Sequence, residues 1–334
     1  MGKVSIGGQA VIEGVMMKNQ DRYAIAVRKP DKEIEVQVNE YISVSKKYRI
    51  FDIPILRGVV NFVESMVIGV KTLTYSAEFY DEEETEKERA RREKKEAKRL
   101  EKAKKKGISA EEAQNAADRR EEKSEDMLMA VTVMFSIVLA VGLFMLLPAF
   151  LVSFVDEYIK NHFLIGLLEG IIRLSIFILY VYLISRMEDI KRTYMYHGAE
   201  HKTINCLEAG EDLTVENVMK HTRFHKRCGT SFLFIVMFVS ILVFMCIRTE
   251  TVWLRLLLRV LLVPVIAGIS YEFIRFAGRS RSKVADIISK PGLWVQRLTT
   301  IEPTPDMVEV AIKAVEGVFD WKEYLRQERE KNNK

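Results

Sequence analysis

The stretch MLMAVTVMFSIVLAVGLFMLLPAFLVSFV, residues 127–155, carries no charged side chain, and it decides the fold class of this chain. A helix that crosses the hydrocarbon core of a bilayer needs ~20 predominantly apolar residues. Helices are favoured there because each satisfies its own backbone hydrogen bonds. The alternative is a buried helix of a soluble core, but this run is too long and too uniformly apolar for one. We therefore predict a transmembrane helix.

Three further apolar blocks follow, at residues 163–184, 231–247 and 253–277. They explain why a chain of 334 residues with 49% hydrophobic and 29% charged side chains does not resemble an average soluble protein. The four blocks predict a polytopic α-helical membrane protein with about four transmembrane helices. These form two pairs, residues 127–184 and 231–277.

The distribution of charge predicts how these helices are oriented. The segment 185–230 is rich in Lys and Arg, whereas the loop after the first span, DEYIKNH, has only Lys160. Cytoplasmic loops carry an excess of Lys and Arg. We therefore expect the N-terminus, residues 185–230 and the C-terminal region 278–334 to be cytosolic in a multi-pass protein of the cytoplasmic membrane. The net charge of +5 is small, which suits contact with membrane lipid and gives no indication of nucleic-acid binding.

Residues 1–50 predict a small β-containing cytosolic region before the spans. AVIEGVMM, YAIAVRKP and EIEVQVNEYISV are rich in β-branched residues and partly alternate. KPDKE, between the last two, has the composition of a turn, so we expect those two to form a hairpin. We interpret the glycine-rich GGQAVIEGVMM as a bulged strand, with a functional site around Glu13 as the alternative.

Residues 51–80 predict an amphipathic helix that lies in the membrane interface, because Arg57, Glu64 and Lys71 interrupt an otherwise apolar run. Residues 81–126 mix both charge signs without an apolar stripe. That composition is typical of a solvated helix or a disordered insert.

The C-terminal region is expected to be broken into pieces by Pro291, Gly292, Pro303 and Pro305. Within it, PDMVEVAIKAVEGVF predicts an amphipathic helix with Pro305 in its first turn. This helix would pack against the rest of the chain or bind a protein partner.

Four of the five histidines fall within residues 197–225. His197-Gly-Ala-Glu200-His201 matches the pattern H-x-x-E-H, in which two imidazoles share one helix face and can bind one zinc ion. The glutamate between them can act on a water molecule. Some metalloproteases use this spacing, but those are large soluble proteins, so we do not predict a protease.

His221, His225 and Cys228 repeat the four-residue histidine spacing and add a thiol. Imidazole and thiolate are both good zinc ligands, and iron or manganese is the alternative metal. Alternatively, some of these side chains bond phosphates or interfacial groups. For the two histidine pairs to converge, the connection between them must fold back, and Gly210 as a helix stop with Thr214 as a helix cap would allow this.

Two further sets of charged residues are candidates. Glu188, Asp189 and Glu272 are expected at the same cytosolic membrane face as the histidines, as additional site residues. The second set lies inside the spans and consists of Glu169, Arg173, Arg255 and Arg259. Charges inside a bilayer are costly unless paired, and they often mark function. Either Glu169, Arg173 and Arg259 pair to lock two helices, or the cluster forms a polar path or a lipid head-group site.

The motifs GGQAVIEGVMM, YHGAEHKTIN, RFHKRCGTSF and PGLWVQRLTT occur in this order. Together they resemble the YqhQ-like family of bacterial membrane proteins, over nearly the whole chain except residues 81–126 and the last few. The family is described as a domain of unknown function and labelled a predicted metal-dependent enzyme. The resemblance implies that the motif positions His197, Glu200, His201, His225 and Cys228 are functional. Lys226 stands where proline is expected and Leu207 where an aromatic residue is expected, and neither is a candidate ligand.

Three functions remain open at this point. The first is a membrane enzyme, a possible hydrolase, in which His201, His225 and Cys228 hold a divalent metal such as zinc. His197 would be a fourth or alternative ligand and Glu200 the general base. The second is a lipid- or solute-binding or transport protein with a structural metal or none. A scaffold whose C-terminal helix recruits a partner is a third reading. Catalytic zinc keeps an open coordination position and structural zinc does not, so an open position would favour the enzyme.

Overall fold

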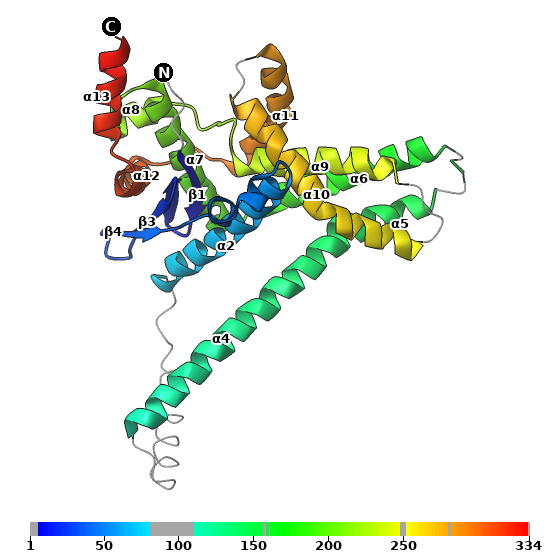
Figure 1. The fold of residues 1–334 in the computed structure, drawn as a ribbon, viewed down its shortest axis with the longest axis horizontal. Coiled ribbons are helices and arrows are strands. Elements are labelled where there is room, and N and C mark those ends of the chain that lie inside the picture. Colours follow the sequence, from blue (N-terminus) through cyan, green and yellow to red (C-terminus); the bar gives the residue numbers. More distant parts are fainter. Residues whose placement is uncertain are drawn as a thin grey trace. The chain divides into compact units, whose positions relative to one another are not determined.

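The computed structural model describes residues 6–80, 110–155, 158–159, 161–247, 252–279 and 282–332. The chain divides into two compact units (Figure 1). The first consists of Met1–Tyr80 together with Asp156–Lys334, and the second of Asp81–Val155. The candidate site residues at 188–228 all lie in the first unit.

An antiparallel sheet begins the first unit, with strands in the order β1-β2-β3-β4. The strands are β1 (Ile6–Val11), β2 (Gly14–Asn19), β3 (Arg22–Arg28) and β4 (Ile34–Glu40). Arg28 pairs with Ile34 across the KPDKE turn. The hairpin predicted at this turn is therefore confirmed.

The glycine-rich stretch at residues 7–17 is a tight hairpin, and the prediction of a single bulged strand was wrong. Val11 pairs with Gly14, so only Ile12 and Glu13 form the turn. Glu13 has a φ of 48°. Turns with positive φ are usually signalled by Asn-Gly or Asp-Gly, and that signal is missing here.

Helices cover both faces of the sheet (Figure 1). Successive strand residues point to opposite faces, so Val15 and Met17 pack towards one helical layer while Met16 packs towards the other. The first layer contains α7 (Glu188–Ala209), α8 (Val215–Lys220), α12 (Pro305–Val318) and α13 (Trp321–Asn332). The second layer is α2 (Leu56–Glu78), whose Ile68 joins the core on that face.

The helix α2 confirms the amphipathic helix predicted for this segment. It buries Ile68 but exposes Val63, Met66, Val67 and Val70. A short helix α1 (Val44–Lys47) and a 3-10 turn η1 (Arg49–Asp52) lead into it. Its location in a membrane interface stays a prediction.

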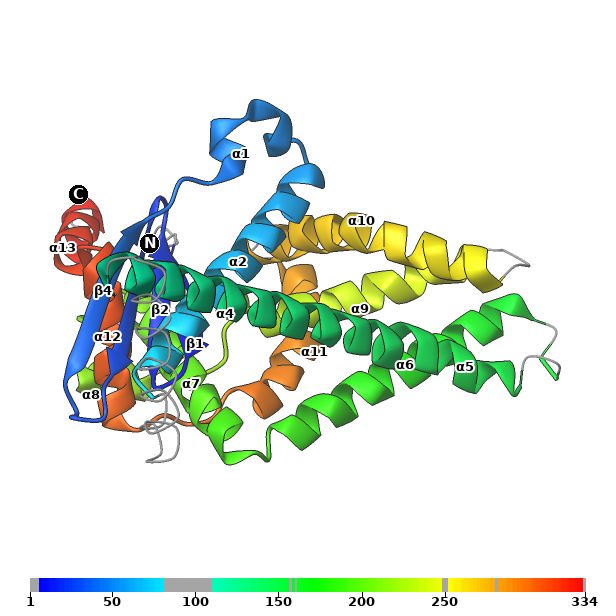
Figure 2. The ribbon, with the colours of Figure 1, turned by 90° about the horizontal axis from the view of Figure 1, so that it is seen from below.

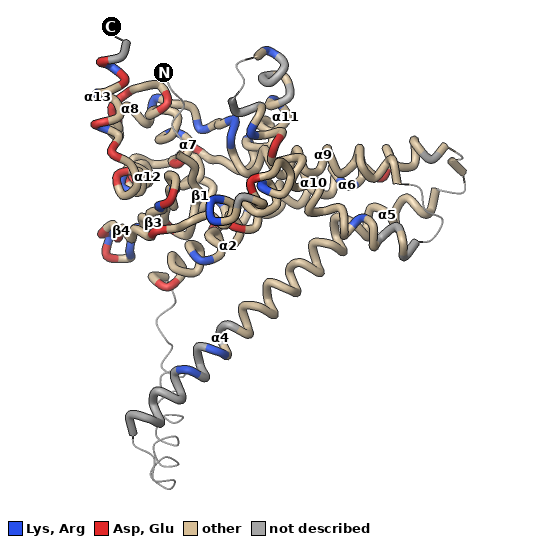
Figure 3. Tube along the Cα trace, in the orientation of Figure 1, with Lys and Arg blue, Asp and Glu red and all other residues tan. Residues whose placement is uncertain are grey.

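Apolar helices α6 (His162–Ile184), α9 (Gly229–Met245) and α10 (Val252–Arg279) lie side by side (Figures 1 and 2). Figure 3 shows charged residues gathered over the sheet, α8, α12 and α13, while α6 and α9 carry very few. Among the described residues, three segments are long and apolar enough to cross a membrane, namely Met127–Ser153, Phe163–Ile184 and Leu257–Phe276.

The third predicted span, 231–247, forms the shorter helix α9 of 17 residues. At 1.5 Å per residue α9 is ~26 Å long, somewhat less than a hydrocarbon core of ~30 Å. The structure therefore supports three candidate spans and one shorter apolar helix, where the sequence predicted about four spans.

The second unit is a continuous helical run of α4 (Ala110–Val141), a π-helical turn η2 (Gly142–Leu146) and α5 (Leu147–Ser153). The charged insert predicted at 81–126 falls partly on α4, and its residues 81–109 lie outside the described part of the chain. The first apolar block occupies the rest of this run.

The C-terminal helices differ from the sequence expectation at one place. Pro291 lies inside α11 (Lys283–Thr299), so Pro291 and Gly292 do not break the chain as predicted. A Cβ at Gly292 would lie 2.7 Å from the Ser231 hydroxyl, so glycine lets α11 pack closely on α9. Pro305 opens α12 as expected. The apolar face of α12 packs in the core of this chain, so a protein partner would have to bind its remaining face.

Candidate metal centre

The site is built on α7, whose ends follow from its sequence. Glu188 and Asp189 occupy its first turn, where negative charge favours a helix, and Gly210 ends it with a φ of 79°. The predicted stop at Gly210 is confirmed. Within the helix, His197 and His201 are four residues apart and therefore share a face.

The segment after α7 folds back over it. Thr214 caps α8 as predicted, with its hydroxyl accepting a hydrogen bond from the Asn217 N–H. The side-chain amide of Asn205 then donates to the carbonyls of Thr222 (2.7 Å) and Phe224 (3.1 Å). These bonds hold the extended chain against α7 and bring its end beside the two histidines.

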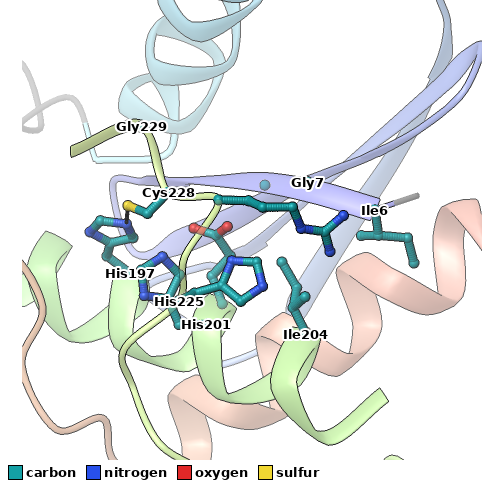
Figure 4. A pocket seen from close by; sticks show the side chains of 11 residues that line it. Ile6, Gly7, His197, His201, Ile204, His225, Cys228 and Gly229 are labelled. Atoms are coloured by element: carbon teal, nitrogen blue, oxygen red, sulfur yellow. Dashed lines mark hydrogen bonds between the residues drawn. The ribbon is translucent and has the colours of Figure 1, made fainter. Parts of the chain in front are cut away.

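A cavity of about 160 Å³ lies where this segment, α7 and β1 meet (Figure 4). The residues that line it are Ile6, Gly7, Gly8, His197, Glu200, His201, Ile204, His225, Arg227, Cys228 and Gly229. Five of the six candidate residues of the two histidine motifs therefore share one small polar space, and only His221 does not line it. Four of these five carry nitrogen or sulfur donors, and Glu200 carries oxygen.

Three donors are close enough together to hold one metal ion. One ring nitrogen each of His197 and His201 and the Sγ of Cys228 lie within 4.8 Å of one another. Nε2 of His197 is 3.2 Å from the Cys228 sulfur. Cys228 is the N-cap of α9, and its sulfur accepts from the Thr230 N–H at 3.4 Å.

Both histidines are oriented by backbone carbonyls. Nδ1 of His197 donates to the Thr299 carbonyl at 2.8 Å, and Nδ1 of His201 donates to the Arg223 carbonyl at 2.6 Å. A histidine whose Nδ1 carries the hydrogen presents Nε2 as a lone-pair donor. Metal-binding histidines almost always have such a second partner, so the residues present fit a bound divalent metal.

Glu200 is 4% exposed and lines the same cavity. Its Oε2 has no hydrogen-bond partner among the described residues, while the backbone N–H of Gly8 hydrogen-bonds the carboxylate. A Cβ at Gly8 would lie 2.8 Å from Cγ of Glu200. Gly8 therefore allows the glutamate to lie directly against β1.

The pKa values of the site follow from its burial and its charges. Burial alone would raise the pKa of the Cys228 thiol, but His197 and His201 lower it well below its usual value. Burial opposes protonation of His197, yet Cys228 and Glu200 raise its pKa to about 9. Burial also raises the pKa of Glu200, partly offset by the two histidines. The two histidines thus favour the thiolate form of Cys228, the form that binds metals.

His225 lies in the cavity but outside the group of three donors. Its Nε2 is 3.6 Å from Oε2 of Glu208, and its ring centroid is 5.6 Å from that of His201. Burial lowers the pKa of His225, with Glu208 acting in the opposite direction. The backbone of His225 is fixed by Gln296 of α11, whose amide bonds both its N–H and its carbonyl.

His221 belongs to a different group. Its Nε2 lies 3.3 Å from Oε2 of Glu211, and Cys206 completes this second set of three donors. Burial, with Glu211 and Asp212, raises the pKa of Cys206 to about 12. A thiol that stays protonated is a poor metal ligand, so this set is the weaker candidate.

The remaining acidic candidates lie away from the cavity. Glu188 and Asp189 are exposed at the start of α7. Glu272 on α10 binds the Arg57 guanidinium with both oxygens, at 2.7 and 2.9 Å. Their role in the structure is helix-end and ion-pair stabilisation, and none of them lines the cavity.

Comparison with known proteins identifies the family of the chain. The profile of the family described as "Protein of unknown function (DUF1385)" matches residues 53–321. The chain belongs to this family. It is similar to the uncharacterized protein YqhQ of Bacillus subtilis (strain 168), with 34% identity over 318 residues that cover 92% of this chain and 90% of that protein. No solved structure matches the chain.

The family match begins at residue 53, so it leaves out the strand β1 that closes the cavity. Gly7 and Gly8 of β1 line the cavity, whereas sequence reasoning had singled out Glu13 in this stretch. Glu13 is instead in the hairpin turn, paired with Arg192 and accepting from the Tyr196 hydroxyl at 3.3 Å. The Gly7-Gly8 pair was the available signal, because adjacent glycines permit a close approach.

The charged residues of the spans form a cluster of their own. The Glu169 carboxylate accepts from Arg173 through Oε1 and from Arg259 through Oε2, each at 2.7 Å. Both guanidinium groups also lie about 5 Å from the Phe244 ring centroid, at 5.0 and 5.2 Å. The side chain of Arg255 lies outside the described part of the structure. Of the two alternatives predicted for these residues, the structure thus shows the pairing of Glu169 with Arg173 and Arg259. This pairing connects α6 to α10.

Gly198 provides a test of how the site is positioned. A Cβ there would lie 2.1 Å from the Ile301 carbonyl oxygen, next to the segment whose Thr299 carbonyl orients His197. Gly198→Ala is therefore expected to destabilise the protein by ~1–3 kcal/mol, since the backbones must separate. The midpoint of thermal unfolding in detergent measures this. Gly7→Ala is the control, because a Cβ at Gly7 meets no atom within 4 Å; equal midpoints for the two variants would contradict the packing argument.

Proposed function

We propose that this chain is a membrane enzyme that depends on a divalent metal, most simply zinc, and acts as a hydrolase. His197, His201 and Cys228 would hold the metal, and Glu200 would be the general base. The observation that carries the proposal is the arrangement of three donors within 4.8 Å, with both histidines oriented by backbone carbonyls. His197 thereby takes the place that sequence reasoning assigned to His225.

The cavity supports a catalytic role over a structural one. Three protein ligands leave a position open for substrate, whereas structural zinc sites are closed by four. A divalent metal there would supply Lewis-acid polarisation of a carbonyl or phosphoryl group. Oε2 of Glu200, which lacks a partner among the described residues, can accept a proton from an attacking water. Gly8 holds the other side of that carboxylate in place.

Three apolar helices suggest that the protein lies in a membrane. We further propose that it is the bacterial cytoplasmic membrane, with the N-terminus, the metal centre and the C-terminus on the cytosolic side. The support is the excess of Lys and Arg between residues 185 and 230, compared with the single lysine of the 156–162 loop.

A second candidate function uses the same cysteine as a nucleophile. Nε2 of His197 and the Cys228 sulfur are 3.2 Å apart, which is within reach of a nucleophile and its base. Cys228 also lies at the N-terminus of α9, a position that favours a thiolate. In that case the chain would form a covalent intermediate on Cys228 and need no metal.

Metal content and alkylation together separate the two functions. Protein purified in detergent without chelator should contain about one equivalent of metal per chain by mass spectrometry. Iodoacetamide should then modify Cys228 only after the metal is removed, because a ligated thiolate is protected. Cys246 is exposed and serves as an internal control that reacts in both states. Stable protein without stoichiometric metal, in which Cys228 reacts at once, would overturn the metal proposal and favour the nucleophile.

A further inference from the structure

A second cavity, which we call the apolar groove, adjoins the metal centre. It has a volume of about 640 Å³ and lies between α2, α9 and α10. Its walls include Met66, Val70 and Leu73 of α2, Phe232 of α9 and Ile274 of α10. Three of these side chains, Met66, Val70 and Leu73, are 54%, 41% and 43% exposed, so the groove presents apolar surface that is not filled by the chain itself.

The groove adjoins the polar cavity. Arg227, Cys228 and Gly229 line both spaces. A Cβ at Gly229 would meet no atom within 4 Å, so the chain is not crowded where the two spaces adjoin. Cys228, one of the three candidate metal donors, therefore borders the apolar groove as well as the polar cavity.

The volumes of the polar cavity and the apolar groove match two different parts of one ligand. Whole ligands usually occupy pockets of ~300–1,000 Å³. The polar cavity, at about 160 Å³, is smaller than that and accommodates only a reacting group. The groove, at about 640 Å³, accommodates the rest of the molecule. Its walls are largely hydrocarbon, and Arg227 at its edge is ion-paired with Glu208, so the matching ligand part is a hydrocarbon chain.

The position of the groove indicates where such a chain comes from. Phe232 is near the start of α9, and Ile274 is near the end of the apolar segment Leu257–Phe276. The groove thus lies at one end of the apolar helices, beside the exposed apolar face of α2. A hydrocarbon chain from the adjoining bilayer surface would reach it without crossing water.

We propose that the substrate is a membrane amphiphile with one long hydrocarbon chain, which lies in the apolar groove while its polar group enters the metal centre. This rests on the proposed function for the reaction, but the groove binds the chain whether or not metal is present. Photolabelling of the full chain in phospholipid nanodiscs with a diazirine analogue of palmitic acid tests it. Labels are expected on the α2 and α9 peptides that line the groove.

The matched variants are Val70→Trp and Val67→Trp. Both valines lie on α2 and are 41% and 51% exposed, but only Val70 lines the groove. The indole at position 70 should fill the groove and remove its labelling, whereas the indole at position 67 should leave labelling unchanged. Competition by palmitic acid or by geranylgeraniol then tells whether an acyl or an isoprenoid chain fits better, and loss of label with either supports the proposal.

Equal labelling of the two variants, or label spread evenly over the lipid-facing side of α6, would overturn the groove proposal, because it would show ordinary lipid contact only. Metal content is measured on the same preparation. Groove labelling without metal would uphold the groove and reject the metal-dependent enzyme. Stoichiometric metal without groove labelling would do the reverse.

Discussion

Replacing Cys228 or His201 by alanine should remove most of the bound metal, while replacing Glu200 by glutamine should leave the metal in place. Cys228 and His201 each supply one of the three donors within 4.8 Å. Mutating even an outer-shell partner of a metal site typically costs ~10–100-fold in affinity, and losing a ligand costs more. Glu200 is no part of the donor group, and glutamine has nearly its shape. Loss of a general base should instead lower metal-dependent hydrolysis by ~10²–10⁴-fold.

His225→Ala is the matched control, and it separates the geometry from the sequence motif. Nε2 of His225 faces Glu208 at 3.6 Å, so its removal should lower metal affinity less than removal of His201. Chelator competition on the purified variants measures the difference. If His225→Ala and His201→Ala lose metal equally, the ligand set is the one expected from sequence spacing, and the His225 ring turns towards the metal when it binds.

The helix carrying His197, Glu200 and His201 could be predicted because its signals are local. The four-residue spacing places the imidazoles on one face, and Gly210 ends the helix by adopting a conformation that other residues rarely adopt. The return of the chain to α7 followed from the cap at Thr214. These features depend only on neighbours in the sequence.

The orientation of His225 could not be predicted, because distant residues set it. Glu208 pairs with its ring, and Gln296 of α11 fixes its backbone. The contribution of β1 was missed for the same reason: Gly8 matters only because α7 packs against it at Glu200. The bounds of α9 differ from those of the apolar block at 231–247, because the Cys228 cap and not the apolar composition defines where the helix begins.

The two groups of charged residues differ in which parts of the chain supply their side chains. The three donors of the proposed metal centre come from one continuous segment folding on itself, whereas the Glu169 cluster is joined across α6 and α10. The pairing of Glu169 with Arg259 could be expected from sequence, because charges inside a bilayer are costly unless paired. That Glu169 would bridge both arginines, one with each oxygen, depends on the side-by-side packing of the helices.

Glu169→Gln should be the most destabilising single change in the apolar helices. Glu169 is 7% exposed and is the carboxylate for both Arg173 and Arg259, which are 3% and 4% exposed. Breaking a buried ion pair by removing one partner costs ~3–5 kcal/mol, because a charge is left uncompensated. Here two buried cations would be left. The midpoint of thermal unfolding in detergent should fall clearly for Glu169→Gln, and Ser175→Ala, an exposed position on the same helix, should leave it unchanged.

Arg259→Gln should cost less, because Glu169 and Arg173 keep their own ion pair at 2.7 Å. The Glu169→Gln, Arg259→Gln double variant should then lose less than the sum of the single losses, since residues in one ion-pair network are coupled. This asymmetry follows from the bridging position of Glu169, and a simple pair between Glu169 and Arg259 would not produce it. Equal losses for the single variants, or strict additivity in the double variant, would show that the bridge does not stabilise the connection between α6 and α10.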